Sequence, residues 1–322
     1  MNYSEAIRQA TKYLLQKKKN FIILGQGVTS PWYVGGTLNG LNKEFSSKII
    51  DTPVSENLIT GAGIGASING LRSLVIHPRM DFMLYAADSI INQAAKWHYV
   101  SGGSSNSPVT IRGIINRGGS QGAQHSQSFH SLFANIPGLR VVMPSSPKDA
   151  HDLLIASVNS NDPVIYIDDA WLYKVNETFK KNFNLKLKDI EPKIIQKGKD
   201  LTIVSSSYFT HLSKNVVKKL KGKVSIELID LRVINPINYK RIINSVKKTG
   251  SLLVIDGGWE NCGLANTIIA EVFKKVDIRR IKNSPNSLSL LDTPAPSSHI
   301  HEKIYYPSEN SIIKAIQNYY KI

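Results

Sequence analysis

The sequence predicts an α/β fold in which a parallel β-sheet carries helices on both faces. Strand-length apolar segments alternate with helix-length amphipathic segments along the whole chain, which is typical of strand–helix–strand units. The chain has 322 residues, and 42% of them are hydrophobic, as in globular proteins. This length allows two ordinary domains, each with its own core.

The first domain is expected over residues 1–173. Its first helix is predicted at 4–19, because apolar residues recur there at helical spacing and lysines close the segment. Short apolar runs predict the strands, and longer periodic runs predict the helices. The expected strands are 21–24, 47–50, 73–76, 109–112, 139–143 and 164–167. The further expected helices are 58–68, 83–99, 126–135 and 149–159.

Residues 174–198 are the expected linker, because they are lysine-rich, contain Pro192 and show no steady period. A second, smaller α/β domain is expected over 199–322. Its expected strands are 201–204, 225–229 and 251–255, and its expected helices are 212–220, 239–248, 263–275 and 308–319.

The chain is strongly basic, with a formal net charge of +16 and a pI near 9.7. Its lysines are scattered in short groups, and no arginine-rich or aromatic-interleaved module is present, so a solvated surface is preferred over a nucleic-acid site. An acidic protein partner is the alternative. The chain lacks a signal-peptide pattern and any membrane-length apolar run, and its single cysteine excludes internal disulfides. We therefore expect a cytoplasmic protein without membrane contact.

Glu56 is the first candidate for a functional residue. A strand is predicted just before it, Pro53 ends that strand, and a helix rich in small residues follows. Ligands of open α/β sheets bind where strands end and helices begin. An ionised Glu56 could accept a charge-assisted hydrogen bond from a ligand nitrogen. The alternative is an acid that only stabilises the helix start.

Two glycine patterns have simpler interpretations than the sites they resemble. The glycines of Gly61–Gly65 fall inside a predicted helix, which favours close helix packing over dinucleotide binding. Gly118–Gly122, with Ser120 at its centre, matches the nucleophile turn of some hydrolases. Its loop is long for such a turn, and no acid and histidine can be assigned to Ser120.

Other candidates follow predicted strands or precede helices. His125 lies between a glycine-rich loop and a helix, where it could transfer protons near neutral pH or merely support a helix start. His77 and Arg79 follow a strand, and an arginine there could bind a carboxylate bidentately. Phe82 either packs in the core or stacks on a ring. The lone Cys262 is expected to serve packing.

Several segments occur together in a specific order, and this combination is characteristic. They are 51–56 (DTPVSE), 91–96 (INQAAK), 101–103 (SGG), 122–128 (GAQHSQS), 137–144 (PGLRVVMP), 230–232 (DLR) and 247–250 (KKTG). The chain closely resembles the beta subunits of thiamine-diphosphate-dependent 2-oxo acid dehydrogenases, such as the decarboxylating component of pyruvate dehydrogenase. The resemblance implies a transketolase-like pyrimidine-binding domain followed by a transketolase C-terminal domain.

The resemblance also implies roles for individual residues. The glutamate that matches Glu56 hydrogen-bonds the aminopyrimidine ring of the cofactor. Val54 would line this ring, and Phe82 would stack on it. His125 matches the histidine that assists transfer of the acyl unit to a lipoyl group. The expected reaction is therefore oxidative decarboxylation of a 2-oxo acid.

One family feature is absent from the sequence. Thiamine enzymes hold the diphosphate through Mg²⁺ with a Gly-Asp-Gly segment, and this chain contains none. The resemblance therefore implies a separate alpha subunit in a two-alpha, two-beta heterotetramer, and the isolated chain is expected to be inactive. Some relatives also bind a structural K⁺. The matching region is Val109 with residues 157–162, where serine replaces the first acid, so the ion is left open.

Departures from the family pattern concern the substrate. Many members have Gly-Glu-Asp-Val-Gly where this chain has Gly25–Val28, and 77–81 is more polar than in ordinary pyruvate enzymes. We therefore expect a more polar or anionic substrate, contacted by His77 and Arg79. The alternatives are an acetoin-cleaving or carboligating subunit with a non-lipoyl acceptor, a non-catalytic partner subunit, and a serine hydrolase that uses Ser120.

Overall fold

The computed structural model describes residues 1–320 and divides the chain into two compact units. Both units are discontinuous in sequence. The first contains Met1–Arg117, Leu132–Ile190 and Ile234–Pro236, and the second contains Gly118–Ser131, Glu191–Val233 and the chain from Ile237 onwards. The segment 118–131, which carries His125, thus packs with the second unit. Within residues 1–320, no helix combines the length and the apolar character needed to cross a membrane.

The first unit is built on a seven-stranded sheet with the order β10-β5-β6-β4-β3-β1-β2. The pairs among β1 to β6 are parallel, as predicted. Because the strands are parallel, their carboxyl ends meet at one edge of the sheet, and the loops that follow them lie close together. The strands are β1 Phe21–Gly25, β2 Ile49–Asp51, β3 Arg72–His77, β4 Val109–Ile115, β5 Arg140–Val142, β6 Val164–Asp169 and β10 Val233–Asn235.

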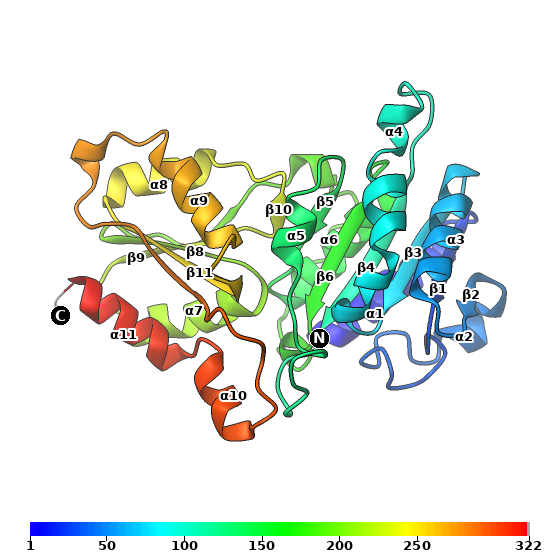
Figure 1. The fold of residues 1–322 in the computed structure, drawn as a ribbon, viewed down its shortest axis with the longest axis horizontal. Helices are drawn as coiled ribbons and strands as arrows, with labels where there is room; N and C mark the ends of the chain where they lie inside the picture. Colours follow the sequence, from blue (N-terminus) through cyan, green and yellow to red (C-terminus); the bar gives the residue numbers. More distant parts are fainter. Residues whose placement is uncertain (321–322) are drawn as a thin grey trace. The chain divides into compact units, whose positions relative to one another are not determined.

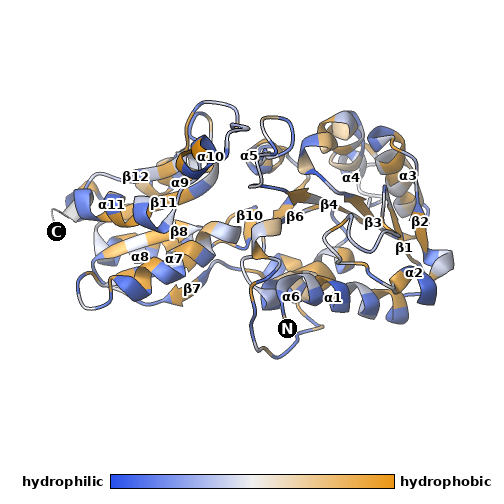
Figure 2. Ribbon diagram, turned by 90° about the horizontal axis from the view of Figure 1, so that it is seen from below, coloured by the Kyte–Doolittle hydropathy of each residue, from blue (hydrophilic) through white to orange (hydrophobic). Residues whose placement is uncertain are grey.

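Helices cover both faces of this sheet (Figure 2). The helices α1 (Tyr3–Lys17) and α6 (Pro147–Asn159) lie on one face and pack on each other, and α3 (Glu56–Ile68) lies on the other face. The helix α1 begins where the Asn2 side chain accepts a hydrogen bond from the Glu5 amide, and its apolar stripe is buried. The unit also contains the short helix α2 (Leu41–Glu44) and part of the short helix α5 (His130–Ala134), whose first two residues belong to the second unit.

The prediction of one long helix over 83–99 is wrong. The chain forms a 3-10 helix at Met80–Ala86, a π-helix at Ser89–Ala94 and a short α-helix, α4, at Trp97–Val100. The buried positions fit the first of these pieces. In the first piece, the large buried side chains Met80 and Met83 and the buried Ala86 lie three residues apart, as suits the three-residue turn of a 3-10 helix. Apolar residues at mixed spacings of three and four do not distinguish these helix types.

The second unit has a five-stranded sheet with the order β12-β11-β8-β9-β7. In Figure 1, α8 and α9 lie on one face of this sheet, and α7 and α11 lie on the other. The apolar side chains of α7 and α11 share one buried cluster with those of β8 and β9. The strands are β7 Lys193–Gln196, β8 Leu201–Ser205, β9 Ile226–Asp230, β11 Leu252–Trp259 and β12 Asn286–Leu290. The helices are α7 Ser207–Lys219, α8 Lys240–Thr249, α9 Leu264–Phe273, α10 His299–Tyr305 and α11 Glu309–Tyr320.

Three features of this unit differ from the sequence-based expectation. The strand β7 lies inside the stretch expected to be a linker, and it pairs antiparallel with β9. The helix expected over 126–135 is reduced to α5, and the side chains of His130 and Ser131 bond to Asp256 on β11 and to the first amide of α9. The strand β12 and the helix α10 were not predicted, because polar residues at 286–289 and 299–303 interrupt the hydrophobic periodicity of these segments.

Candidate functional site

A pocket of about 370 Å³ lies at the carboxyl edge of the first sheet. Three neighbouring strands, β3, β1 and β2, deliver most of its lining, because each strand ends just before residues that face the pocket. Five residues singled out from the sequence, namely Val54, Glu56, His77, Arg79 and Phe82, meet here. The full lining is Gln26, Tyr33, Val54, Glu56, Ile59, Ile76, His77, Pro78, Arg79, Phe82 and Tyr85.

Glu56 is the first residue of α3, and its side chain is half-buried. The preceding Ser55 has an extended φ of −169°, and its side chain does not cap the helix. The first-turn amides of α3 therefore receive no hydrogen bond from the N-cap side chain. Within residues 1–320, the Glu56 carboxylate forms no hydrogen bond or ion pair. It is therefore an open hydrogen-bond acceptor at the start of a helix, and it lines the pocket.

His77 ends β3 and is almost completely buried. Its Nε2 atom lies 3.0 Å from the Thr60 hydroxyl on α3. Burial lowers the pKa of His77 to about 4, because the surrounding apolar atoms disfavour the imidazolium. His77 is therefore neutral at physiological pH, and it contributes hydrogen bonding and shape rather than charge.

Arg79 supplies the positive charge of this pocket. Its side chain is half-buried, and its Nη1 atom is fully buried without a hydrogen-bond partner among residues 1–320. A buried, unpaired guanidinium N–H costs about 1–3 kcal/mol, so such groups normally face a ligand or water. The ring of Phe82, one turn further along the 3-10 helix, contributes a flat apolar surface to the same pocket.

The loop after β1 adds two pocket residues that sequence reasoning missed, Gln26 and Tyr33. The Gln26 amide donates a hydrogen bond of 2.9 Å to the Tyr33 hydroxyl. Gly27 has a φ of +66°, and a Cβ atom there would lie 2.1 Å from the Tyr33 ring, so only glycine fits beneath it. The Asp51 carboxylate at the end of β2 accepts hydrogen bonds from the Gly27 amide (2.7 Å) and from Thr29. The only sequence signal was the unusual Gly25–Val28 stretch.

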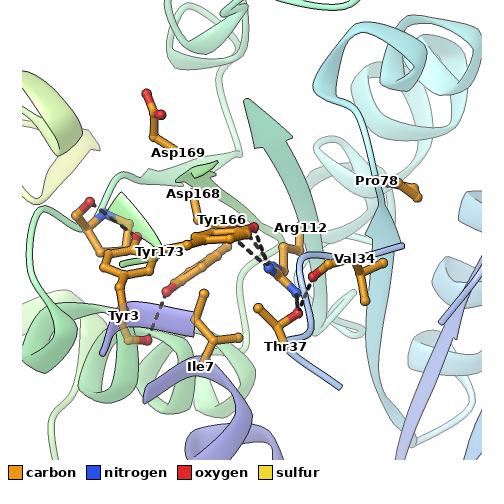
Figure 3. A network of polar contacts seen from close by, with 12 residues as sticks. Tyr3, Ile7, Val34, Thr37, Pro78, Arg112, Tyr166, Asp168, Asp169 and Tyr173 are labelled. Atoms are coloured by element: carbon orange, nitrogen blue, oxygen red, sulfur yellow. Dashed lines mark hydrogen bonds and ion pairs between the residues drawn. The ribbon is translucent and has the colours of Figure 1, made fainter. Parts of the chain in front are cut away.

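A buried ion pair holds the far end of the same loop (Figure 3). The Arg112 guanidinium donates to both carboxylate oxygens of Asp168, at 2.8 and 2.7 Å, and to the Thr37 hydroxyl at 2.8 Å. The Tyr173 hydroxyl donates to Asp168 as well. Burial alone would lower the pKa of Arg112, but Asp168 raises it above its ordinary value, and the guanidinium stays charged. Thr37 in turn donates to the Val34 carbonyl, beside Tyr33.

His125 belongs to the segment 118–131 of the second unit. Its side chain is half-buried, and its amide lies 3.5 Å from the Gly122 carbonyl. Ser120, the residue of the hydrolase-like pattern, has a φ of +58°, and its amide donates to Glu302 on α10. Ser120 lies five residues after the end of β4, whereas a nucleophile turn follows its strand directly.

Two other candidates also have defined positions. The expectation that Cys262 serves packing is wrong, because its side chain is exposed in a turn with a φ of +53° before α9. In the region matching the potassium site, Arg72 Nη1 donates to the carbonyls of Val158 (2.8 Å) and Ser160 (2.6 Å). Its Nη2 atom donates to the Asn161 side chain. Among residues 1–320, no group of three His, Cys, Asp or Glu side chains is arranged to hold a metal ion.

Comparisons with known proteins are consistent along the whole chain. Residues 1–169 match the transketolase pyrimidine-binding domain, and residues 191–312 match the transketolase C-terminal domain. The chain is 33% identical to the pyruvate dehydrogenase E1 component subunit beta of Rickettsia bellii, covering 97% of this chain and 96% of the relative. It is also 33% identical to the acetoin:2,6-dichlorophenolindophenol oxidoreductase subunit beta of Cupriavidus necator, covering 96% and 94%.

A solved structure is similar over the same extent. It is described as a split-gene transketolase, inactive beta4 tetramer, and it has a TM-score of 0.80 with 16% identity, covering 99% of this chain and 98% of the other. At this identity, the likeness supports the fold alone.

Proposed function

Because the chain belongs to the family of beta subunits of thiamine-diphosphate-dependent 2-oxo acid dehydrogenases, we propose that the pocket at Glu56 holds the aminopyrimidine end of the cofactor. The observation that carries this proposal is the open carboxylate of Glu56, which faces the same pocket as Phe82 and Val54. A carboxylate acceptor, a flat ring and an apolar wall suit a planar ring that bears N–H groups.

When bound, thiamine diphosphate supplies the carbon nucleophile and the electron sink for decarboxylation. In this proposal, Glu56 accepts a hydrogen bond from a ring nitrogen and holds the proton exchanged there. Phe82 and Val54 fix the plane of the ring. His125 acts later, as the residue that donates or accepts a proton while the acyl unit passes to a lipoyl group.

We further propose that an alpha subunit completes the site, and that two of each subunit assemble. The sequence lacks the Gly-Asp-Gly segment that would hold Mg²⁺ and the diphosphate. Large apolar side chains around the pocket are also exposed, which is typical of surfaces that bind a partner. These are Trp32 (73% exposed), Val54 (65%), Leu58 (70%) and Tyr85 (74%). The domain boundaries near residues 173 and 199 are part of the same proposal.

The substrate is proposed to be a 2-oxo acid with an additional polar or anionic group. The unpaired Nη1 of Arg79 supports this, because a carboxylate would satisfy it bidentately. Arg79→Ala should raise the KM for such an acid by roughly tenfold or more, and Arg79→Lys should recover part of the loss. Pyruvate, which has no second charge, should be affected much less. Equal KM values for the dianionic acid in wild type and Arg79→Ala would refute this assignment.

An acceptor other than a lipoyl group is the second candidate. The chain is as similar to an acetoin oxidoreductase subunit as it is to the pyruvate dehydrogenase subunit, at 33% identity in both cases. This equal similarity supports testing a non-lipoyl acceptor. Reconstitution with the alpha subunit, followed by assays with a lipoyl domain and with an artificial electron acceptor, separates the two acceptors. Transfer to the lipoyl domain supports the first candidate, and transfer only to the artificial acceptor supports the second.

The region that matches the potassium site of some relatives leads to a further proposal. We propose that Arg72 replaces the ion, since its guanidinium already bonds two carbonyls of the 157–162 region. In this proposal, the fixed guanidinium replaces an exchangeable ion as the partner of the carbonyls at the end of α6.

Glu56→Gln in the reconstituted enzyme tests the catalytic proposal. Its decarboxylation rate should fall by about 10²–10⁴-fold, because glutamine cannot take up the proton. Glu44→Gln is a matched control, since Glu44 forms an exposed ion pair with Lys12 away from the pocket. A non-catalytic partner subunit, or a hydrolase that uses Ser120, would keep its rate in Glu56→Gln. Turnover by the isolated chain would contradict the need for an alpha subunit.

A further inference from the structure

The segment that carries His125 is bound to the second unit by side chains that no sequence motif indicated. Its glycine-rich start is conformationally permissive, with a positive φ at Gly118, Gly119, Ser120 and Gly122. A loop of this kind needs anchors at its ends if a side chain within it is to keep one position. Both ends are anchored in the second unit.

The later anchor is a buried chain of hydrogen bonds. The Ser128 hydroxyl lies 2.7 Å from His130 Nδ1, and His130 Nε2 lies 2.8 Å from Asp256 Oδ1 on β11. His130 is fully buried, and Asp256 is 3% exposed. A buried carboxylate is tolerated only with partners, so the imidazole contact is energetically important. Both bonds persist whether the imidazole is neutral or protonated, because the Ser128 hydroxyl can donate or accept.

Packing around the imidazole is tight. A Cβ atom at Gly258 would lie 2.8 Å from His130 Cε1, so glycine is required next to this ring. The neighbouring Ser131 hydroxyl accepts a hydrogen bond of 3.1 Å from the Leu264 amide, the first of α9. Phe129 packs on Trp259, with ring centroids 5.9 Å apart. At the other end of the segment, the Ser120 amide donates to Glu302 at 3.1 Å.

This constellation contains a serine, a histidine and an aspartate, but its burial excludes a hydrolytic triad. Ser128 is 5% exposed, and His130 is inaccessible, so no acyl group could reach the hydroxyl. An ordinary core network remains the competing explanation. A core network would stabilise the whole unit, whereas an anchor would affect chiefly the mobility of residues 119–129.

We infer that Ser128, His130 and Asp256 are positioning residues, which fix the loop bearing His125 on the second unit and thereby set the place from which His125 acts. This inference rests on the proposed role of His125 in acyl transfer. The anchoring itself is a property of this chain and can be measured without cofactor or partner.

The test is hydrogen exchange of the full-length chain, followed by mass spectrometry of peptides that cover 118–131. Asp256→Ala should raise exchange at 119–129 by roughly tenfold, because the bond that holds His130 is lost. Asp256→Asn keeps an acceptor for His130 Nε2 and should stay close to wild type. Ser128→Ala removes a single bond and gives a smaller rise, and it serves if Asp256→Ala does not fold.

Thr202→Val is the matched control, because it breaks a buried hydroxyl network with Ser245 and Thr249 in the same unit. It should leave exchange at 119–129 unchanged. The inference is overturned if Asp256→Ala leaves exchange at 119–129 unchanged, or if it raises exchange equally across the second unit.

The assembled enzyme separates this inference from the proposed function. Asp256→Ala should slow acyl transfer to the lipoyl domain by about tenfold, with little change in decarboxylation measured with an artificial acceptor. If His125→Ala itself leaves acyl transfer unchanged, the proposed role of His125 is refuted, while the exchange data still decide the anchoring.

Discussion

Replacing His77 should remove a specific part of the pH dependence of stability. Burial lowers the pKa of His77 from 6.5 to about 4, whereas the unfolded chain returns it to its ordinary value. Between these values, the unfolded state binds the proton and the folded state does not, so stability falls as the pH drops from 6.5 towards 4. Above pH 6.5, neither state is protonated and the contribution is constant.

The magnitude follows from the pKa difference. A difference of about 2.5 corresponds to about 3 kcal/mol of unfolding free energy, lost in full only below pH 4. His77→Gln keeps a hydrogen-bonding group near Thr60 but cannot titrate. The unfolding free energy of the variant should therefore fall less than that of wild type between pH 6.5 and 4.5. Repacking around the new side chain shifts the unfolding free energy of the variant by an amount that does not depend on pH.

Urea unfolding at several pH values measures this difference. Tryptophan fluorescence reports the first unit once Trp259, the one tryptophan of the second unit, is replaced in both proteins by Trp259→Phe. Comparing the two proteins cancels the other titrating groups. Parallel curves for wild type and His77→Gln would refute the reasoning, as would an NMR titration that gives His77 a pKa near 6.5.

Two further predictions concern fixed charges. Asp168→Asn should cost about 3–5 kcal/mol of unfolding free energy, because it leaves the buried Arg112 guanidinium without its counter-charge. Chemical denaturation measures this cost. A loss below about 1 kcal/mol would contradict the importance of the pair. Arg72→Met should cost about 2–3 kcal/mol, because two carbonyls lose a charged donor. The wild-type melting temperature should be the same in KCl and NaCl of equal ionic strength, and a rise specific to K⁺ would contradict replacement of the ion by Arg72.

The order of strands and helices could be predicted because burial in a parallel sheet leaves a direct pattern. The segments that became β1, β3 and β6 are short apolar runs, and their helices carry one apolar stripe. The region 80–100 could not be predicted, because spacings of three and four suit 3-10, α- and π-turns alike. The strand β7 was missed, because Lys193–Gln196 has only two apolar residues and is stabilised by its partner β9.

The pocket residues divide in the same way. Glu56, His77, Arg79 and Phe82 could be singled out, because each follows a predicted strand or starts a helix, whereas Val54 was indicated only by the resemblance to the family. Gln26 and Tyr33 could not, since a glycine turn and a long-range hydrogen bond to Asp51 bring their loop to the pocket.

Asp256 anchors the His125 segment through His130, from which it is 126 positions away in the sequence. No local pattern reports such a pairing. Likewise, Cys262 is exposed in a turn where its own φ is positive, and the neighbouring residues gave no signal for this conformation.

The central claim is that the Glu56 carboxylate activates the cofactor by hydrogen bonding to its ring. Exchange of the C2 proton of thiamine diphosphate with solvent deuterium, followed by NMR in the reconstituted enzyme, tests it most directly. Glu56→Gln should slow this exchange by about 10²–10⁴-fold, while the Glu44→Gln control exchanges at the wild-type rate. Equal exchange rates in wild type and Glu56→Gln, with the cofactor bound in both, would contradict the claim.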